Sequence, residues 1–554
     1  MAISVYVGGE NFDELRRRGC YYVDKTEMLY ELVNNTDNIV TLFTRPRRFG
    51  KTLTMRMMES FFDIRRDSRA VFDGLAIMRH EAFCEEWMNQ YPVLFITLKD
   101  AESLKFETAY AKLKNIIADV CKKHDYLGSS ERVNPFDAEV FMRLQGNRAS
   151  DYEVQNSLLL LSRMMAAHYG KPVILLIDEY DVPLAKANEE KEAGERYYGQ
   201  MLEVIRGIMS TALKSNDFLK FAVVTGCLRI AKESIFTGVN NIKSYSVLDR
   251  RFNASFGFTD EEVHIMLENA GLEDRIDLVR NWYDGYVFGN KKVFCPWDVV
   301  NYVADALDDP EIEPDVYWRN SSGNGIIREF VARREFRVKP KFESLMNGGT
   351  VVQTIADDLT YDTLYESEDH LWSVLLMTGY LTKADPNGRG NTLELRIPNR
   401  EIASIFQDSV AKYFADTINV EAQKGMMEAL WHGDEEKASK AISDFLWQTI
   451  SYNDYHEDYY HAFLTGIFVG RGYTAESNKE RGLGRPDIKL TDDDNRRILI
   501  IEAKKSESRA RMAHDCEEAL RQIVDQEYAK GLEAYKVICY GIAFFQKSAM
   551  VKKL

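Results

Sequence analysis

The first half of the chain alternates short apolar runs with longer stretches in which apolar residues recur every three or four positions. Short apolar runs are typical of buried strands, and the longer pattern is typical of amphipathic helices. The predicted strands cover residues 39–43, 93–98, 173–177 and 221–224, and the predicted helices between them include residues 109–120, 154–165 and 198–213. Because strands that alternate with helices form parallel sheets covered by helices, we expect residues 1–258 to form an α/β domain.

A basic segment joins the first predicted strand to a helical run that begins at Thr52. A sharp turn from strand to helix directs free N–H groups and the positive dipole end of the helix toward one point, which suits a polyphosphate. Gly50 would let the phosphates approach the backbone, Lys51 would reach the terminal phosphates, and Thr52 would hold Mg²⁺. Arg48 is a further candidate nucleotide-binding residue of this loop. The usual pattern has glycine in place of Arg45, so the loop alone leaves a chance Gly-Lys-Thr turn as an alternative.

Two carboxylates, Asp178 and Glu179, follow the third predicted strand directly. Open α/β sheets bind ligands at the carboxyl ends of their strands, so Asp178 is placed to hold Mg²⁺ through water. Glu179 is placed to polarise an attacking water. A lone acid after a strand is often only a helix cap or a surface residue, but the pairing with an upstream Gly-Lys-Thr favours a P-loop ATPase site of the ASCE type.

The fourth predicted strand leads to Thr225, and Arg229 follows it closely. Thr225 is a candidate for sensing the γ-phosphate. Arg229 is a candidate for stabilising the charge of the transition state, and Arg250 and Arg251 are alternatives for that role. Surface arginines greatly outnumber arginines that act on a nucleotide, so these assignments are hypotheses.

Residues 259–450 are expected to form a helical, winged-helix-like middle region. Thr259 and Glu262 have the spacing of a capping box, which predicts the start of a helix. The segments at residues 282–286 and 296–298 are aromatic and contain glycine or proline. We interpret them as parts of a helical lid packed on the ATPase domain rather than as a platform that stacks nucleic-acid bases.

Within the middle region, a helix at residues 371–380 is followed by strands at 381–384 and 392–397 and by a helix from Glu401. Helix, hairpin and helix form the pattern of a winged-helix-like unit, which binds DNA in some proteins and contacts other proteins in many. We favour contact with protein. Residues 421–450 continue as amphipathic helices.

Two short β runs near the C-terminus flank a polar segment at residues 491–495, which predicts a hairpin. If residues 494–495 form its turn, Asp487 lies directly opposite Glu502. Such cross-strand neighbours have Cβ atoms about 5 Å apart. Lys504 lies on the same face as Glu502, because successive side chains of a strand point to opposite faces.

Two carboxylates at that separation repel each other by roughly 3–4 kcal/mol at an effective dielectric constant near 20, and a divalent cation removes the conflict. Oxygen ligands without a nearby Cys or His favour Mg²⁺ or Mn²⁺, and Lys504 is placed to orient or activate a water beside the metal. Asp487, Glu502 and Lys504 therefore predict a phosphodiesterase site. The alternative is an exposed hairpin whose ion pairs contribute under ~1 kcal/mol.

The segments around the hairpin complete a recognisable core. Residues 454–470 are expected to form a helix that offers Glu457 as an additional metal ligand, and a helix at 510–530 and a strand at 537–544 follow the hairpin. Helix, three strands, helix and strand form the minimal core of a restriction-type nuclease. We therefore expect residues 451–554 to fold as a restriction-endonuclease-like α/β domain.

The composition of the chain limits the kinds of partner that it can bind. A net charge of −16 argues against a generally basic surface, so any binding of nucleic acid must be local. The C-terminal segment has such local charge at Arg471, Lys479, Arg481, Arg485, Lys505, Arg509 and Arg511. No apolar run reaches ~18 residues, and no charged segment followed by an apolar core opens the chain, which predicts a cytoplasmic protein without membrane contact. The seven scattered cysteines suggest neither a disulfide framework nor a thiolate zinc site.

Six motifs together carry a family resemblance, and they span nearly the whole chain. They lie at residues 22–26 (Tyr-Val-Asp-Lys-Thr), 45–52 (Arg-Pro-Arg-Arg-Phe-Gly-Lys-Thr), 176–181 (Leu-Ile-Asp-Glu-Tyr-Asp), 232–236 (Lys-Glu-Ser-Ile-Phe), 282–286 (Trp-Tyr-Asp-Gly-Tyr) and 484–487 (Gly-Arg-Pro-Asp). The chain resembles the bacterial AAA-ATPase-like proteins that carry a C-terminal PD-(D/E)XK nuclease-superfamily domain. Arg45 in place of glycine matches the loop of that family. The resemblance implies nuclease roles for Asp487, Glu502 and Lys504, with Glu457 as a fourth residue.

We therefore expect two sites with different chemistry. The first would bind and hydrolyse ATP with Mg²⁺, and the second would cleave nucleic acid, DNA in preference to RNA, with Mg²⁺ or Mn²⁺. ATP would move the middle region and gate the nuclease, in defence or mobile-element biology, and the chain is a candidate homo-oligomer. One alternative is an ATP-dependent signalling or scaffold protein whose nuclease-like domain binds nucleic acid or protein without cleavage. Another is a structural interaction protein that does not bind ATP.

Overall fold

The computed structural model describes most of the 554 residues. The described residues are 3–34, 38–188, 197–228, 235–236, 242–318, 327, 339–346, 348–356, 359, 367–417, 420–449, 460, 464, 474–477, 486–493 and 495–554. The chain forms two compact units, Met1–Trp318 with Val352–Asn399 and Arg319–Val351 with Arg400–Leu554, and each is described by itself. No helix in the described ranges is both long and apolar enough to cross a bilayer. The expected domain boundaries near residues 258 and 450 stay predictions.

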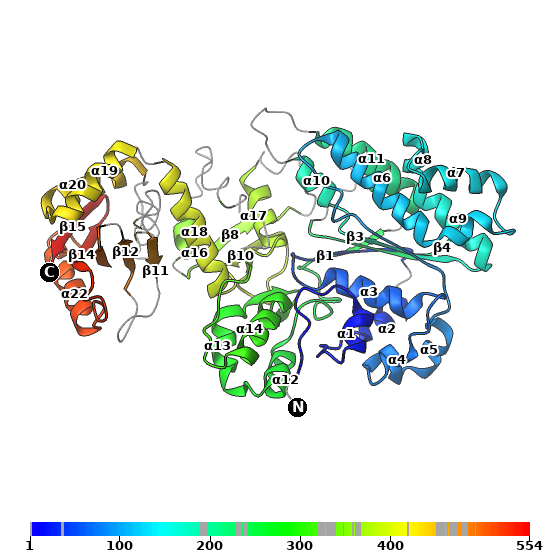
Figure 1. Cartoon of the computed structure of the whole chain (residues 1–554), viewed down its shortest axis with the longest axis horizontal. Coiled ribbons are helices and arrows are strands. Elements are labelled where there is room, and N and C mark those ends of the chain that lie inside the picture. Colours follow the sequence, from blue (N-terminus) through cyan, green and yellow to red (C-terminus); the bar gives the residue numbers. More distant parts are fainter. Residues whose placement is uncertain are drawn as a thin grey trace. The chain divides into compact units, whose positions relative to one another are not determined.

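A five-stranded sheet forms the centre of the first unit (Figure 1). Its strands are β1 (Val40–Thr44), β2 (Val93–Thr97), β3 (Val173–Asp178), β4 (Leu219–Gly226) and β5 (Ile242–Tyr245). Their spatial order is β2-β3-β4-β1-β5, and every neighbouring pair runs parallel. The expected parallel α/β fold is confirmed. The edge strand β5 was not expected, because its Ile-Lys-Ser-Tyr sequence has only four residues, two of them adjacent polar ones.

Helices cover both faces of this sheet, and Figure 1 shows α1, α2 and α3 on one face and α6, α9 and α11 on the other. The helices are α1 (Phe12–Arg17), α2 (Glu27–Asn34), α3 (Lys51–Phe62), α4 (Arg69–Phe72), α5 (Glu81–Trp87), α6 (Phe106–Lys123), α7 (Pro135–Gln145), α8 (Asp151–Gln155), α9 (Ser157–Tyr169), α10 (Val182–Ala187) and α11 (Tyr198–Leu213). Met58 and Phe62 of α3 join Phe43 and Val223 of the sheet in one buried core. Each such side chain contributes roughly 1.5–3 kcal/mol by leaving water, which fixes α3 against the sheet.

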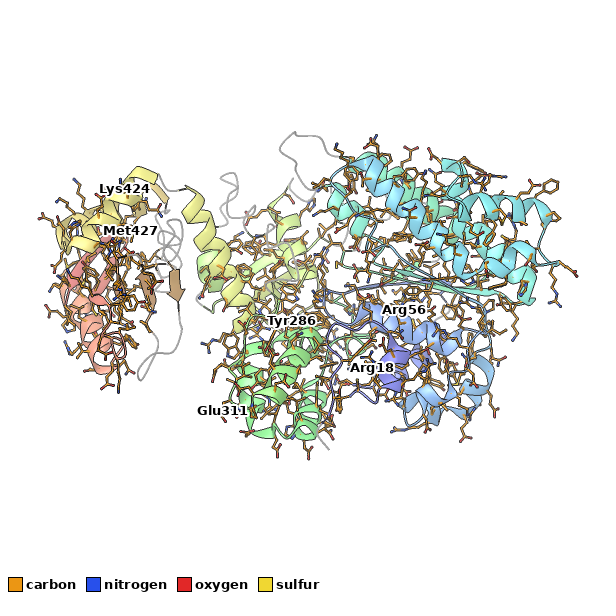
Figure 2. The ribbon with its side chains drawn as sticks, in the orientation of Figure 1. Arg18, Arg56, Tyr286, Glu311, Lys424 and Met427 are labelled. Carbon is orange, nitrogen blue, oxygen red and sulfur yellow. The ribbon has the colours of Figure 1, made fainter. Side chains whose placement is uncertain are left out.

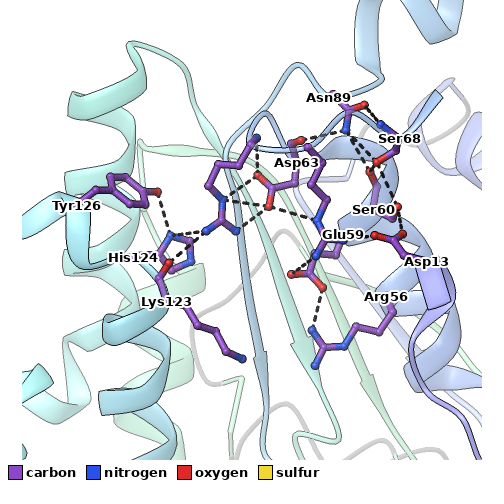
Figure 3. A network of polar contacts seen from close by, with 12 residues as sticks. Asp13, Arg56, Glu59, Ser60, Asp63, Ser68, Asn89, Lys123, His124 and Tyr126 are labelled. Carbon is purple, nitrogen blue, oxygen red and sulfur yellow. Dashed lines mark hydrogen bonds and ion pairs between the residues drawn. The ribbon is translucent and has the colours of Figure 1, made fainter. Parts of the chain in front are cut away.

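A buried polar network surrounds the C-terminal end of α3 (Figure 3). Asp63 follows the helix, is 0% exposed and pairs with Arg65 at 2.6 Å. Arg66 reaches Asp13 of α1 at 2.6 Å. The guanidinium of Arg65 also lies 3.3 Å from Nδ1 of His124, which follows α6. The network therefore joins three helices through charged groups that are paired with one another.

The rest of the first unit is a second group of elements. These are α12 (Asp260–Ala270), α13 (Ile276–Tyr283), β6 (Tyr286–Phe288), β7 (Lys291–Val293), α14 (Pro296–Asp308), β8 (Val351–Thr354), α17 (Glu368–Met377), β9 (Thr382–Lys383) and β10 (Thr392–Arg396). The capping box of Thr259 and Glu262 is present at the start of α12, as predicted. Glu262 also pairs with Lys25 at 2.6 Å, which attaches α12 to the N-terminal segment. The predicted hairpin β9–β10 is present and gains β8 as a third strand.

The second unit is built around a mixed five-stranded sheet. Its elements are α16 (Lys339–Met346), α18 (Arg400–Thr417), α19 (Val420–His432), α20 (Glu435–Thr449), β11 (Thr474–Ser477), β12 (Ile488–Asp492), β13 (Arg497–Lys505), α22 (Met512–Asp525), β14 (Lys536–Phe545) and β15 (Ser548–Lys553). The order is β11-β12-β13-β14-β15, in which only β13 and β14 pair in parallel. The succession of β11, β12, β13, α22 and β14 agrees with the expected restriction-type core, and the first helix expected for it, at residues 454–470, lies almost wholly outside the described residues. The helix expected from Glu401 is present as α18, but it groups with this unit rather than with the β9–β10 hairpin.

Helix α20 covers β15, an edge strand that was not expected. Alternate N–H groups of β15 donate to Ser443 at 2.9 Å, Ser439 at 2.9 Å and Glu435 at 3.0 Å. These three residues are four positions apart in sequence and therefore lie along one face of the helix. Because an uncovered edge strand can pair with other chains, this contact protects the sheet as well as stabilising it.

The buried His124 predicts acid sensitivity of the first unit. Burial lowers the pKa of His124 to about 3, from 6.5. Between these values the unfolded chain binds a proton that the folded chain does not, so stability falls as the pH drops below 6.5. From pH 7.5 to 5.5 the loss from this group is about 1.3 kcal/mol. His124→Gln should remove that part of the pH dependence in urea unfolding, whereas His264→Gln, at an exposed site, should leave it unchanged. An identical pH dependence for wild type and His124→Gln would contradict this assignment.

Candidate nucleotide site and candidate nuclease site

The turn from β1 into α3 has the geometry expected of a phosphate loop. Helix α3 begins at Lys51, and its N-cap residue Gly50 has a left-handed backbone with φ of 79°. That conformation is strained for residues with a Cβ, which accounts for glycine at this position. The first N–H groups of α3 therefore face the loop, where a phosphate would accept hydrogen bonds from them.

Lys51 lies inside this loop and is only 3% exposed. Its Nζ donates to the carbonyl oxygens of Arg45 and Pro46, both at 3.1 Å, and lies 3.6 Å from a carboxylate oxygen of Glu179. Burial opposes the charge of Lys51, and the neighbouring sulfur of Cys227 and the carboxylates of Glu179, Asp181 and Asp178 favour it. The net effect raises the pKa of Lys51, so the ammonium group stays charged.

Three threonines donate hydrogen bonds to the carboxylate of Asp178. Its carboxylate accepts from Thr225 at 2.6 Å, from Thr52 at 2.9 Å and from Thr97 at 3.3 Å. Burial raises the pKa of Asp178, and the hydrogen bond from Thr225 opposes this effect. The structure thus brings Thr52, Asp178 and Thr225 together, as the sequence led us to expect. Thr97 was missed, and only its pairing opposite Asp178 across β2 and β3 reveals it.

Glu179 continues this acidic group in an unusual backbone conformation. Its φ of 55° is left-handed, and its N–H lies 3.4 Å from Oγ1 of Thr225. Left-handed non-glycine residues are uncommon and concentrate at functional sites. Together Asp178, Glu179 and Lys51 form a compact cluster of two carboxylates and one ammonium group at the end of β3.

Asp181 is a site residue that was quoted only as part of a motif. Its Oδ2 accepts from the N–H groups of Cys227 and Leu228, at 2.9 and 3.0 Å. Burial and the nearby charge of Glu179 raise its pKa. Asp181 therefore fixes the segment after β4, including the Cys227 sulfur that lies 3.7 Å from Nζ of Lys51.

Arg45, which replaces the usual glycine, has a structural role. It is fully buried and donates to the carbonyl oxygens of Thr44 and Tyr245, both at 2.9 Å, and of Phe252 at 3.0 Å. Burial lowers its pKa to about 10, so the guanidinium stays charged at neutral pH. The side chain points away from the loop interior into the contact between β1, β5 and the following turn. The substitution therefore adds an internal support without filling the phosphate-binding face of the loop.

The remaining arginine candidates are arranged differently. Arg48 stacks on Trp297 with its guanidinium carbon 3.8 Å from the ring centre. Arg251 lies 3.3 Å from a carboxylate oxygen of Glu31, and Arg250 is exposed. Arg229 lies outside the described residues. Their roles toward a nucleotide stay predictions.

In the second unit, the expected pairing of Asp487 with Glu502 is present in the hairpin register. Ile488 pairs with Ile501, which sets Asp487 opposite Glu502. The N–H of Asp487 lies 3.4 Å from Oε2 of Glu502, and Oδ2 of Asp487 accepts from the N–H of Ala503 at 2.7 Å. Lys504 Nζ lies 3.7 Å from Oε1 of Glu502. The two carboxylates and the ammonium group therefore form one cluster.

Two residues from beyond the hairpin, Tyr528 and Gln522, lie near this cluster. Tyr528 is 2% exposed; burial raises its pKa, and the charges of Glu502 and Asp487 add to the effect. Gln522 of α22 hydrogen bonds to the Tyr528 side chain. Tyr528 was not among the candidates drawn from the sequence. The proposed ligand Glu457 lies outside the described residues.

Both clusters contain the oxygen ligands that hard divalent cations prefer. Asp178 with the hydroxyl of Thr52, and Asp487 with Glu502, fit Mg²⁺ or Mn²⁺ better than a thiophilic metal. All seven cysteines are buried thiols without disulfides, and the prediction of no disulfide framework is confirmed for them. The fold and these arrangements define a P-loop ATPase-like unit and a restriction-endonuclease-like unit on one chain.

Comparison with known families agrees with this class. Residues 6–236 match the family described as a predicted AAA-ATPase, and residues 455–554 match the PD-(D/E)XK nuclease superfamily. The resemblance drawn from the sequence motifs is thereby confirmed. The chain is also 24% identical over 542 residues to a protein of Azotobacter chroococcum mcd 1 described as "Uncharacterized protein in vnfD 5'region". That alignment covers 94% of this chain and 92% of the relative, so the similarity extends over nearly the whole length of both.

The buried Arg45 yields a stability prediction. Arg45→Gly would restore the common loop glycine but leave three carbonyl groups without their donor. The unfolding free energy of the first unit should fall by about 3 kcal/mol or more, as measured by urea unfolding. Arg47→Gly, at an exposed position of the same loop, is the matched control and should cost about 1 kcal/mol or less. Equal urea midpoints for these two variants would show that the carbonyl contacts of Arg45 do not support the fold.

Proposed function

We propose that this chain is a cytoplasmic ATPase that binds and hydrolyses ATP with Mg²⁺ at the loop between β1 and α3. The observation that carries the proposal is the convergence of Thr52, Thr225 and Lys51 on Asp178 and Glu179. These residues come from separate segments of the chain, and their combination suits a nucleoside triphosphate better than a plain structural ion pair. The match of residues 6–236 to a predicted AAA-ATPase supports it.

The residues present can divide the work of hydrolysis. The Lys51 ammonium would leave the loop carbonyls and bind the terminal phosphate oxygens. The Glu179 carboxylate would accept a proton from water as the water oxygen attacks the γ-phosphorus and the bond to the ADP oxygen breaks. Thr225 would hold Asp178 and Glu179 in position. Mg²⁺, when bound near Thr52 and Asp178, would neutralise charge that develops on the phosphates.

We further propose that Asp487, Glu502 and Lys504 form a nuclease site dependent on Mg²⁺ or Mn²⁺, with DNA preferred to RNA. Asp487 and Glu502 would hold the metal, and Lys504 would orient the water that attacks the phosphodiester phosphorus as the bond to the leaving sugar oxygen breaks. The match of residues 455–554 to the PD-(D/E)XK nuclease superfamily supports this assignment. The state of the nucleotide would control cleavage, in defence or in the biology of mobile elements.

The ATPase proposal predicts a clear effect of Glu179→Gln. The amide keeps the shape of the side chain but cannot accept a proton from water. The rate of phosphate release should fall by about 100-fold or more, while the Kd for ATP should change by about threefold or less. Glu203→Gln, at an exposed position on α11, should retain the wild-type rate. A Glu179→Gln protein that hydrolyses ATP at the wild-type rate would refute the assigned role.

The nuclease proposal is tested with the full chain on plasmid, linear duplex, single-stranded DNA and RNA, with Mg²⁺ or Mn²⁺ and with or without ATP. Asp487→Asn and Glu502→Gln should each reduce cleavage by about 100-fold or more, because each removes a metal ligand. Lys504→Gln should also reduce cleavage. Lys536→Gln, at an exposed position at the start of β14, is the matched control and should cleave normally.

Wild-type levels of cleavage by Asp487→Asn and Glu502→Gln would place the activity elsewhere. If the wild-type chain hydrolyses ATP but cleaves none of the substrates under any metal, the second unit acts by binding alone. That result would support the signalling or scaffold alternative. If ATP does not bind, the structural alternative is favoured.

A further inference from the structure

The phosphate loop has bulky side chains at positions where many such loops have small ones, and these side chains contact later segments of the same unit. Phe49 is 1% exposed, and its ring centre lies 5.1 Å from that of Tyr286, which Figure 2 labels. Pro46 packs at Gly379, where an added Cβ would come within 3.0 Å of the Pro46 ring. The candidate nucleotide site is therefore in direct contact with β6 and with the turn after α17.

A third contact involves the backbone of the loop itself. Arg48 has a left-handed φ of 72°, which is unfavourable for a residue with a Cβ. Two groups at the start of α14 hold it: the thiol of Cys295 lies 3.7 Å from the Arg48 carbonyl, and the ring of Trp297 lies 3.8 Å from its guanidinium. The Trp297 ring is fixed in turn, because its Nε1 donates to the carbonyl of Tyr317 at 3.2 Å.

Arg48 lies two residues before Gly50, so its backbone conformation helps to set the direction in which the loop enters α3. The loop carbonyls also bind Lys51 Nζ, and a phosphate would have to draw that group away. Loop geometry and phosphate binding are therefore linked. A contact that holds Arg48 in its left-handed conformation therefore also stabilises the loop conformation that binds phosphate.

We propose that Trp297 is a positioning residue of the nucleotide site, which acts by holding Arg48 and thereby the phosphate loop. This inference rests on the proposed ATP site and adds α14 to it, although α14 lies far from the loop in sequence. By thermodynamic reciprocity, a nucleotide that binds the positioned loop must strengthen the contact between Arg48 and Trp297. The second group of elements in the first unit thus responds to the nucleotide through a specific pair of side chains.

The first test measures the Kd of the full chain for Mg·ATPγS by calorimetry. Trp297→Ala should weaken binding about fivefold, the size expected for loss of a partly buried cation–π contact. Trp297→Phe should restore most of the affinity, because it keeps an aromatic face. Trp282→Ala is the matched control: it removes a partly buried indole from α13 of the same unit and should leave the Kd unchanged.

The second test is a double-mutant cycle with Arg48→Gly, since glycine adopts the left-handed conformation without strain. In that background Trp297→Ala should have no further effect on the Kd, whereas a purely structural role of Trp297 would weaken binding in both backgrounds. Equal effects in both backgrounds, or tighter binding by Trp297→Ala, would overturn the inference.

A third measurement needs no variant and so does not depend on the folding of Trp297→Ala. Hydrogen exchange of the wild-type segment at residues 295–303 should slow at least threefold on saturation with Mg·ATPγS. Unchanged exchange there, with nucleotide bound, would overturn the inference but leave the proposed ATPase intact. Failure of wild type to bind Mg·ATPγS at all would overturn both.

Discussion

The buried carboxylate of Asp178 is the constraint on which the first unit depends. A carboxylate removed from water is costly unless hydrogen bonds and an opposite charge compensate for it. Here the hydroxyls of Thr52, Thr97 and Thr225 supply the hydrogen bonds. Thr52 belongs to α3, Thr97 to β2 and Thr225 to β4. The hydrogen bonds to one carboxylate therefore align three elements around the end of β3. An arrangement that stabilises the fold is thus also the one that would present a metal ligand beside the phosphate loop.

The loop itself shows how a departure from a common motif can be structural. The buried side chain of Arg45 stabilises the packing of β1 against β5 and the following turn by donating to three backbone carbonyls. Arg48 and Phe49 extend outward instead, to Trp297 and the β6 hairpin. In a loop with glycine and small residues these contacts would be absent. The replacement of small residues therefore connects the candidate nucleotide site to the segments that follow the sheet.

Local patterns in the sequence predicted the elements well where burial and helical periodicity are strong. Helix α11 has the predicted bounds of residues 198–213, and the four apolar runs are all strands of the parallel sheet. The register of the hairpin followed from its turn alone, because a strand pair fixes every residue once one pair is known. The edge strands β5 and β15 were missed, since both are short and mix polar with apolar residues.

The sequence could not predict which site residues come together from distant segments of the chain. Thr97 donates to Asp178 from 81 positions away in the sequence. Tyr528 comes near enough to Glu502 for the carboxylate to raise its pKa only after α22 has returned the chain to the sheet. The buried role of Arg45 likewise depends on carbonyls some 200 residues later in the chain. Motif spacing identified Lys51, Asp178, Asp487 and Glu502 as candidates because those residues lie at strand ends or in one hairpin. Their supporting residues carry no such local signal.

The central claim is that the loop between β1 and α3 binds ATP through Lys51 and the group around Asp178. An experimental structure of the full-length Glu179→Gln variant with Mg·ATP tests it most directly. We predict that Nζ of Lys51 leaves the carbonyls of Arg45 and Pro46 for the terminal phosphates, with Mg²⁺ held by Thr52 and Asp178. A nucleotide bound elsewhere, with Lys51 still on those two carbonyls, would contradict it.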